Sequence, residues 1–135
     1  MQLVIDANVV VQLGLSGADL GPLLVHDLIS PPIMPYEVTS SLSEMVHRGE
    51  LLPEPARLAV VRLASLPIRV EEPPDFFLRA WDLAHSLGWA KTYDAEYVAL
   101  SMMTGSPLIT IDDRLRRGAG HIVDMPLISE IHAPG

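Results

Sequence analysis

The sequence contains no cysteine, and this absence excludes two kinds of site at the outset. Without thiols there is no disulfide framework, and no metal ion can be held by thiolate ligands. The absence agrees with the reducing cytoplasm, where we expect the protein to reside. Metal ligands would have to be carboxylate or imidazole groups, and the five histidines show no tight ligand spacing.

Long hydrophobic runs are also missing. The longest uncharged stretch, residues 97–111, is interrupted by Gly105 and Pro107, and it is too short to span a membrane. Asp6 interrupts the first apolar run and no basic residue precedes it, so we expect no signal peptide.

Basic residues are scarce. The chain has 9 lysines and arginines against 17 aspartates and glutamates, which gives a formal net charge of -8. Such a charge argues against indiscriminate binding of nucleic acids. It does not exclude a nuclease, because a metal site built from carboxylates itself contributes negative charge, and it would attract a basic segment of a partner protein.

What the chain does have is hydrophobic residues, at 49% of 135 positions. This length suits one domain, residues 1–135, with a substantial core. The mean hydropathy of +0.30 is high, which favours a buried parallel sheet or a surface covered by a partner. The sequence shows no repeat, low-complexity segment or domain linker.

Short apolar segments alternate with helical patterns along the chain. We expect strands at residues 2–5, 28–30, 68–70 and 108–111, with a short fifth strand at 122–123. Helical patterns cover residues 9–15, 19–28, 35–47, 53–65, 74–87 and 93–103, with Ser16 and Gly17 separating the first two. This alternation predicts an α/β fold, in which right-handed crossovers place helices on both faces of a mostly parallel sheet of four to five strands. The result would be a three-layer α/β/α domain.

Four acidic residues stand where apolar runs end or helices begin: Asp6, Glu37, Asp94 and Asp112. In open parallel sheets, ligands bind beyond the carboxyl ends of the strands, and Asp6 and Asp112 follow two such ends. Asp94 opens the helix that leads to the strand before Asp112, and Glu37 lies in the first turn of its helix. All four side chains would then face one cleft.

Carboxylates that converge from distant positions repel each other unless a positive charge lies between them. A hard divalent cation with oxygen ligands is the usual answer, and Mg²⁺, with Mn²⁺ as the alternative, suits carboxylates best. Such an ion polarises a phosphoryl oxygen and activates water. Asn8, Thr92 and Thr110 are candidates to orient the carboxylates or waters.

Each acidic residue also has a simpler interpretation. Asp6 would cap the following helix, and Asp94 would favour the positive end of its own helix. Asp112 would be an ordinary turn residue, although we favour it over the adjacent Asp113 as a ligand because it follows the strand. Glu44 lies seven residues after Glu37 on nearly the same helical face and is the second choice to Glu37.

Two further groups of residues are open to more than one interpretation. We expect Glu96 to be solvated, with a role in the cleft as the lesser alternative. Arg114, Arg116 and Arg117 form either a solvated turn or a phosphate-attracting run beside Asp112. Lys91 has a similar but weaker case.

The chain resembles the PIN-domain ribonucleases, specifically VapC-like toxins. The resemblance rests on four blocks in the family order, which cover nearly the whole chain: Val4-Ile5-Asp6-Ala7-Asn8, Glu37-Val38 with Arg48-Gly49-Glu50-Leu51, Thr92-Tyr93-Asp94-Ala95 with Tyr97-Val98-Ala99-Leu100, and Leu108-Ile109-Thr110-Ile111-Asp112 with Leu115. The adjoining acids Asp112 and Asp113 depart mildly from the family pattern.

The resemblance implies a Mg²⁺-dependent endoribonuclease that works as a homodimer and is inhibited by a cognate antitoxin. Carried over by position, Asp6, Glu37, Asp94 and Asp112 would be its acidic quartet.

Three other functions compete with this one. A catalytically silent binding module of the same fold would keep the quartet without turnover, and a nuclease directed at DNA would differ in substrate. A phosphoacceptor receiver domain would need an acidic pair near the N-terminus and a lysine after a late strand. The single lysine, Lys91, precedes a helix instead.

Overall fold

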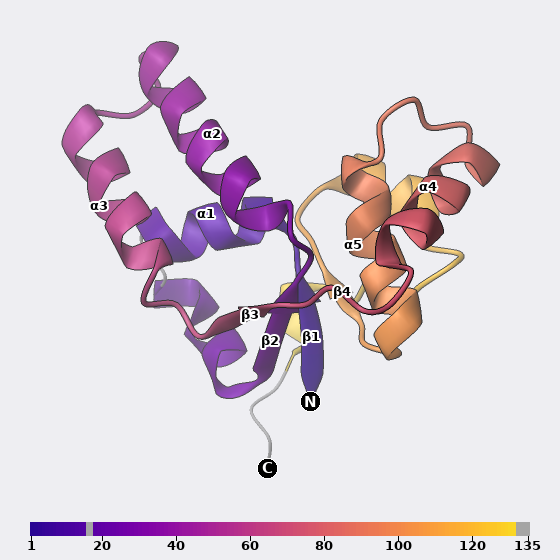
Figure 1. Cartoon of the computed structure of the whole chain (residues 1–135). Helices are drawn as coiled ribbons and strands as arrows, with labels where there is room; N and C mark the ends of the chain where they lie inside the picture. The colour runs from indigo at the N-terminus through magenta and orange to yellow at the C-terminus, as the bar shows by residue number, and fades with distance from the viewer. Residues whose placement is uncertain (16–17, 132–135) are drawn as a thin grey trace.

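Four parallel strands form the centre of the computed structural model, which describes residues 1–15 and 18–131 (Figure 1). The sheet order is β3-β2-β1-β4, and in chain order the strands are β1 (Gln2–Ile5), β2 (Asp27–Ser30), β3 (Ile68–Val70) and β4 (Leu108–Ile109). In register, Val4 of β1 lies opposite Ile29 of β2 and Leu108 of β4. The predicted parallel α/β sheet is therefore confirmed.

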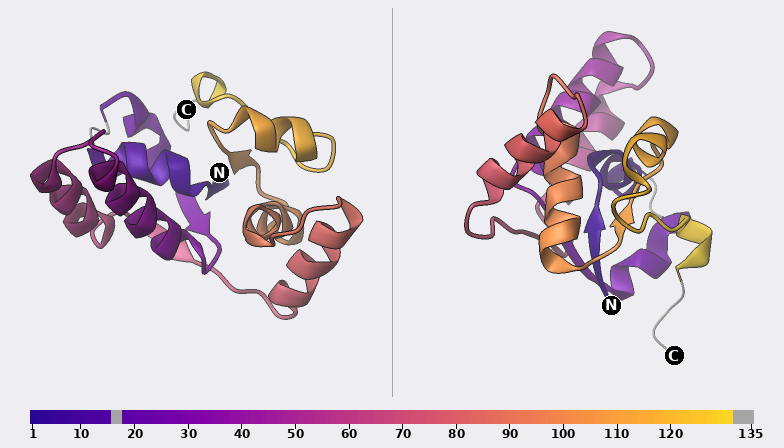
Figure 2. Two further views of the ribbon diagram at one scale, coloured as in Figure 1. Left: turned by 90° about the horizontal axis from the view of Figure 1, so that it is seen from above. Right: turned by 90° about the vertical axis from the view of Figure 1, so that its right-hand side faces the viewer.

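Helices cover both faces of the sheet, as the three-layer prediction requires (Figure 2). The first three helices pack against one another on one side, and α4 and α5 pack together on the other. The α-helices are α1 (Ala7–Leu15), α2 (Met34–His47), α3 (Pro53–Leu63), α4 (Phe76–Ser86), α5 (Tyr93–Thr104) and α6 (Asp113–Ala119), and two 3₁₀ helices are η1 (Ala18–Val25) and η2 (Ile128–Glu130).

The central strand β1 and helix α5 carry much of the core. Leu3, Val4 and Ile5 are completely buried, because a parallel strand with helices on both faces has no solvent side. Every residue of α5 from Ala95 to Ser101 is also buried, so this helix lies inside the molecule instead of showing one polar face. Gly105, with a φ of 66°, ends it in the left-handed conformation that glycine adopts without steric cost.

Several predicted boundaries were wrong. Residues 122–123 do not form a fifth strand, because the Ile122 and Val123 N–H groups both bond to the Ala119 carbonyl at the end of α6. The fourth strand ends at Ile109 instead of residue 111. The helix expected over 19–28 is the 3₁₀ helix η1, which contains Pro22, and β2 already begins at Asp27. The expected break at Ser16 and Gly17 lies outside the described residues.

Helix α6 was not predicted from the sequence, which indicated a basic turn there. The Asp112 side chain begins this helix by accepting hydrogen bonds from backbone N–H groups. No helix in the described part of the chain is long and apolar enough to cross a membrane.

Candidate metal and nuclease site

Asp6 lies at the carboxyl end of the central strand and is almost completely buried, with 5% of its surface exposed. The Thr110 hydroxyl donates a hydrogen bond to Asp6 Oδ2 at 2.7 Å. Burial raises the pKa of Asp6 to about 6, against the effect of the Thr110 bond, and the nearby carboxylates of Asp94 and Glu37 add to the rise. Asp6 is thus held in place by a neutral donor while its negative charge stays uncompensated.

Glu37 reaches the same region from the first turn of α2. The hydroxyl of Tyr97, a buried residue of α5, donates a hydrogen bond to Glu37 Oε1 at 2.7 Å. Burial raises the pKa of Glu37, the Tyr97 bond opposes this rise, and repulsion from Asp94 contributes to it. Tyr97 was missed in the sequence, although it lies three residues after Asp94 and so shares its helical face.

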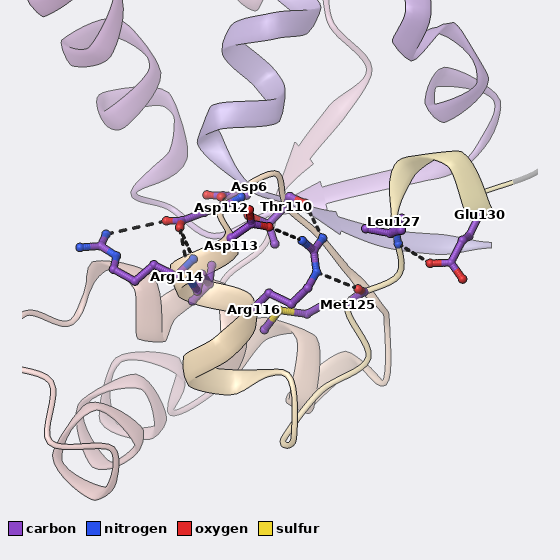
Figure 3. A network of polar contacts seen from close by, with 10 residues as sticks. Asp6, Thr110, Asp112, Asp113, Arg114, Arg116, Met125, Leu127 and Glu130 are labelled. Carbon is purple, nitrogen blue, oxygen red and sulfur yellow. Dashed lines mark hydrogen bonds and ion pairs between the residues drawn. The ribbon is translucent and has the colours of Figure 1, made fainter.

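Asp94 and Asp112 face a common arginine, Arg114, which Figure 3 shows beside Asp112. Arg114 Nη2 lies 3.9 Å from Asp94 Oδ2 and 3.7 Å from Asp112 Oδ2. Burial raises the pKa of Asp94, Arg114 opposes this rise, and Asp112 adds to it. The Arg114 side chain is 79% exposed, so this contact is weak and can be exchanged for another cation.

Asp112 also caps a helix, a role that the sequence suggested for Asp6 but not for Asp112. Its Oδ1 accepts hydrogen bonds from the backbone N–H groups of Arg114 at 2.9 Å and Leu115 at 3.2 Å, which makes it the N-cap of α6. Its other oxygen, Oδ2, faces Arg114. The two oxygens of one carboxylate thus serve the helix and the site separately.

The chemistry of this donor set fits a hard divalent cation. Among the described residues, no three carboxylate or imidazole side chains form a closed ligand cluster. The four acids nevertheless act on one another electrostatically, because Asp6 is influenced by Asp94 and Glu37, and Asp94 by Asp112. All are oxygen donors, and the hydroxyl and cap bonds leave Asp6, Glu37 and Asp112 each a second oxygen.

The auxiliary residues expected from the sequence separate into two groups. Thr110 connects two acids, because its Oγ1 donates to Asp6 and accepts from the Asp112 backbone N–H at 3.0 Å. Thr92 lies directly before α5 and Asn8 is exposed in the first turn of α1, and neither side chain makes a hydrogen bond within the described part of the protein. Glu44 is exposed and faces Arg48 at 3.8 Å, and it lines a hollow on α2 together with Glu37.

The comparisons with known proteins agree with this fold. The profile of the PIN domain family matches residues 3–120. The chain belongs to the PIN-domain family. The Mycobacterium tuberculosis protein named ribonuclease VapC12 is 31% identical over 131 residues, which cover 94% of this chain and 99% of that protein.

Two solved structures share the PIN fold of this chain. PAE2754 from Pyrobaculum aerophilum has a TM-score of 0.73 at 20% identity, covering 96% of this chain and 90% of its own. VapBC-1 from nontypeable Haemophilus influenzae has a TM-score of 0.62 at 16% identity, covering 96% and 100%.

The basic run of this PIN domain is divided by α6. Figure 3 shows Arg114 and Arg116 leaving the helix in opposite directions. Arg116 donates hydrogen bonds to the carbonyls of Thr110 at 2.9 Å and Met125 at 3.4 Å, and it pairs with Asp113 at 3.1 Å. Arg116 therefore braces the chain around α6, and it holds Asp113 on its own side of the helix.

Glu96 of the PIN domain is buried, so the expectation that it is solvated was wrong. It is 7% exposed, because α5 is enclosed along most of its length. Burial raises its pKa to about 7, and Glu37 adds to this rise. An isolated acidic residue in a helical pattern usually lies on a solvated face. The burial of Glu96 becomes evident only from the packing of α5 in the structure.

Beside the acids, the PIN domain has a cleft of about 920 Å³. Its lining comes from α2, the segment between α4 and α5, the start of α5, and α6: Glu37, Gly88, Trp89, Ala90, Lys91, Tyr93, Asp94, Arg114, Leu115, Arg117 and Gly118. Two of the four acids therefore open directly onto a groove that also contains cations and aromatic rings.

Proposed function

We propose that this chain is a Mg²⁺-dependent endoribonuclease and the toxin of a toxin–antitoxin pair. The observation that carries the proposal is the convergence of Asp6, Glu37 and Asp94 at the carboxyl edge of the sheet, where burial and mutual repulsion raise the pKa of each carboxyl. Asp6 is buried and the other two carboxyls are partly buried, and a divalent cation would remove the repulsion among them. The name of the 31% identical relative, ribonuclease VapC12, supports RNA as the substrate.

In this proposal the four acids, Asp6, Glu37, Asp94 and Asp112, hold the metal ion. When bound, Mg²⁺ or Mn²⁺ would activate water and stabilise the charge that develops on the phosphate. The chain's own residues orient the ligands: Thr110 fixes Asp6, and Tyr97 fixes Glu37. Such outer partners typically set ligand orientation and basicity.

We further propose a cognate antitoxin and a homodimer as the partners of this protein. The family resemblance and the VapBC-1 neighbour support the antitoxin. Large apolar side chains that are exposed on α3 and α4, such as Val61 at 56% and Trp81 at 51%, support surfaces that a partner or a second copy covers. Light scattering of the chain alone would measure its subunit number, and a monomer would contradict the homodimer.

The decisive experiment incubates the purified, partner-free protein with a mixed pool of structured RNAs. Parallel arms contain Mg²⁺, Mn²⁺ or a chelator, and the variant Asp94→Asn is compared with Glu44→Gln, which removes an exposed carboxylate outside the quartet. We expect discrete fragments with metal for the wild type and Glu44→Gln, and none for Asp94→Asn. Intact RNA in every arm with folded protein would favour the silent binding module, and cleavage of DNA in preference to RNA would reassign the substrate.

A further inference from the structure

Four cationic side chains make no hydrogen bond or ion pair within the described residues: Arg57, Arg79, Lys91 and Arg117. The other five lysines and arginines of the chain, all arginines, are engaged with carboxylates or backbone carbonyls. Two of the four unpaired cations, Lys91 and Arg117, line the cleft beside the acidic site. Both are exposed, so their charges are available to a ligand.

Helix α6 carries Arg117, and the segment before α5 carries Lys91. Arg117 lies three residues after Arg114 on α6, so both lie on one helical face about 4.5 Å apart along the axis. Arg114 faces the acids, and Arg117 is therefore displaced along α6 from that position. Lys91 comes from the segment before α5, and Trp89 of this segment packs so closely on Gly118 that a Cβ there would lie 3.1 Å from the ring.

The net charge of -8 makes these two cations important for the binding of any anionic ligand. A polyanion that approaches the carboxylates is repelled unless nearby cations offset the repulsion. Within the cleft, only Arg114 is partly neutralised by the acids, which leaves Lys91 and Arg117 as its unpaired positive groups. Guanidinium and ammonium groups both bind phosphate oxygens, the first in a bidentate fork and the second as a point charge.

We propose that Lys91 and Arg117 form a phosphate-binding subsite for single-stranded RNA flanking the scissile bond. This inference rests on the proposed function and names the part of the cleft that holds the substrate strand. We infer a single strand from the exposed Tyr93, which lines the same cleft as the acids and the cations. Unpaired bases stack on aromatic rings, whereas the bases of a duplex are already stacked.

The test measures RNA binding separately from cleavage. A labelled single-stranded RNA is titrated with Asp94→Asn protein in chelator, over a series of salt concentrations, by fluorescence anisotropy. The double variant Lys91→Gln/Arg117→Gln is compared with Arg57→Gln/Arg79→Gln, which removes the same charge from the two unpaired cations outside the cleft. We expect the cleft variant to bind at least tenfold more weakly at low salt. Its slope of log K against log salt should be shallower by about 1.4, at roughly 0.7 for each phosphate contact on a single strand.

Cleavage by the same double variants, with Asp94 intact, separates the subsite from the catalytic proposal. The cleft variant should raise KM and leave kcat close to the wild-type value. Equal weakening in both double variants would show a general charge effect and overturn the subsite, as would unchanged binding in both. Loss of binding to a polyglutamate peptide with RNA binding intact would assign the cations to an acidic protein instead. RNA binding that depends on Lys91 and Arg117 without any metal-dependent cleavage would uphold the subsite and refute the nuclease.

Discussion

The two halves of the acidic site are held by different means. Asp6 and Glu37, the hydroxyl-held pair, each receive a short hydrogen bond from a neutral side chain, from Thr110 and Tyr97 respectively. Asp94 and Asp112, the arginine-facing pair, lie opposite an exposed Arg114.

The difference shows how position and charge can be controlled separately. A hydroxyl fixes a carboxylate oxygen without supplying a charge, so the repulsion within the hydroxyl-held pair persists and remains available to attract a cation. Arg114 opposes the rise in the pKa of Asp94, but its side chain is 79% exposed and its contacts with the acids are weak, so a metal ion can displace it. The predictions below test this contrast, from the largest expected effect to the smallest.

Removing the charge of Asp6, one of the hydroxyl-held pair, should have the largest effect on cleavage. Asp6→Asn keeps an acceptor for Thr110 but removes a proposed metal ligand. We expect cleavage to fall by more than about 100-fold, which is the upper end for losing an outer-shell partner alone. Gel-based cleavage rates measure this, with Glu44→Gln as the matched control, and near wild-type rates for Asp6→Asn would remove Asp6 from the ligand set.

The same variant should change the pH dependence of stability in metal-free protein. Folding raises the pKa of Asp6 from 3.8 to about 6, so its contribution to stability is fully present below pH 3.8 and is lost as pH rises through about 6. The loss is on the order of 3 kcal/mol. Urea unfolding in chelator should show this decline in the wild type and a flatter profile in Asp6→Asn. Identical profiles would mean that folding does not raise the pKa of Asp6.

Removing one hydroxyl should have an intermediate effect. Tyr97→Phe leaves Glu37 without its donor, and we expect Mg²⁺ affinity to fall by about 10- to 100-fold, as for other outer-shell partners. Arg114→Gln should act in the opposite direction and tighten Mg²⁺ binding a few-fold, because it removes a competing cation near Asp94. Calorimetric titration measures both, and equal weakening in the two variants would erase the distinction between the halves.

The smallest expected effect is the contribution of the Asp112 N-cap to the free energy of unfolding. Asparagine is as good an N-cap as aspartate, so Asp112→Asn removes the charge and keeps α6, whereas Asp112→Ala removes both. We expect the two variants to lose cleavage equally and to differ by about 1 kcal/mol in the free energy of unfolding. Equal stability would show that the cap contributes little.

The sequence predicted those features that depend on neighbouring residues. Apolar runs located the strands, and Ile68–Val70 matches its predicted range in full. The positions of the four acids after strands and at helix starts predicted that they converge, and in the structure Asp6 is influenced by Glu37 and Asp94, and Asp94 by Asp112. The family resemblance added the activity and the partners, which residue patterns alone do not specify.

Features that depend on contacts between distant segments were not visible. The bond between Tyr97 and Glu37 joins positions sixty residues apart, so the spacing of Tyr97 from Asp94 indicates its helical face but not its partner. The burial of Glu96 follows from the packing of α5, and the separation of Arg116 from Arg114 follows from helix α6, which was not expected. Once α6 is known, its periodicity places Arg114 and Arg117 on one face.

The order of the sheet determines when the proposed site can form during synthesis of the chain. The strand β4 is the last to leave the ribosome, and it pairs with β1, the first, through Val4 and Ile5. Asp6 gains its Thr110 hydrogen bond, and the site gains Asp112, only after this pairing. A nascent chain or a truncated product that lacks β4 therefore cannot assemble the proposed site.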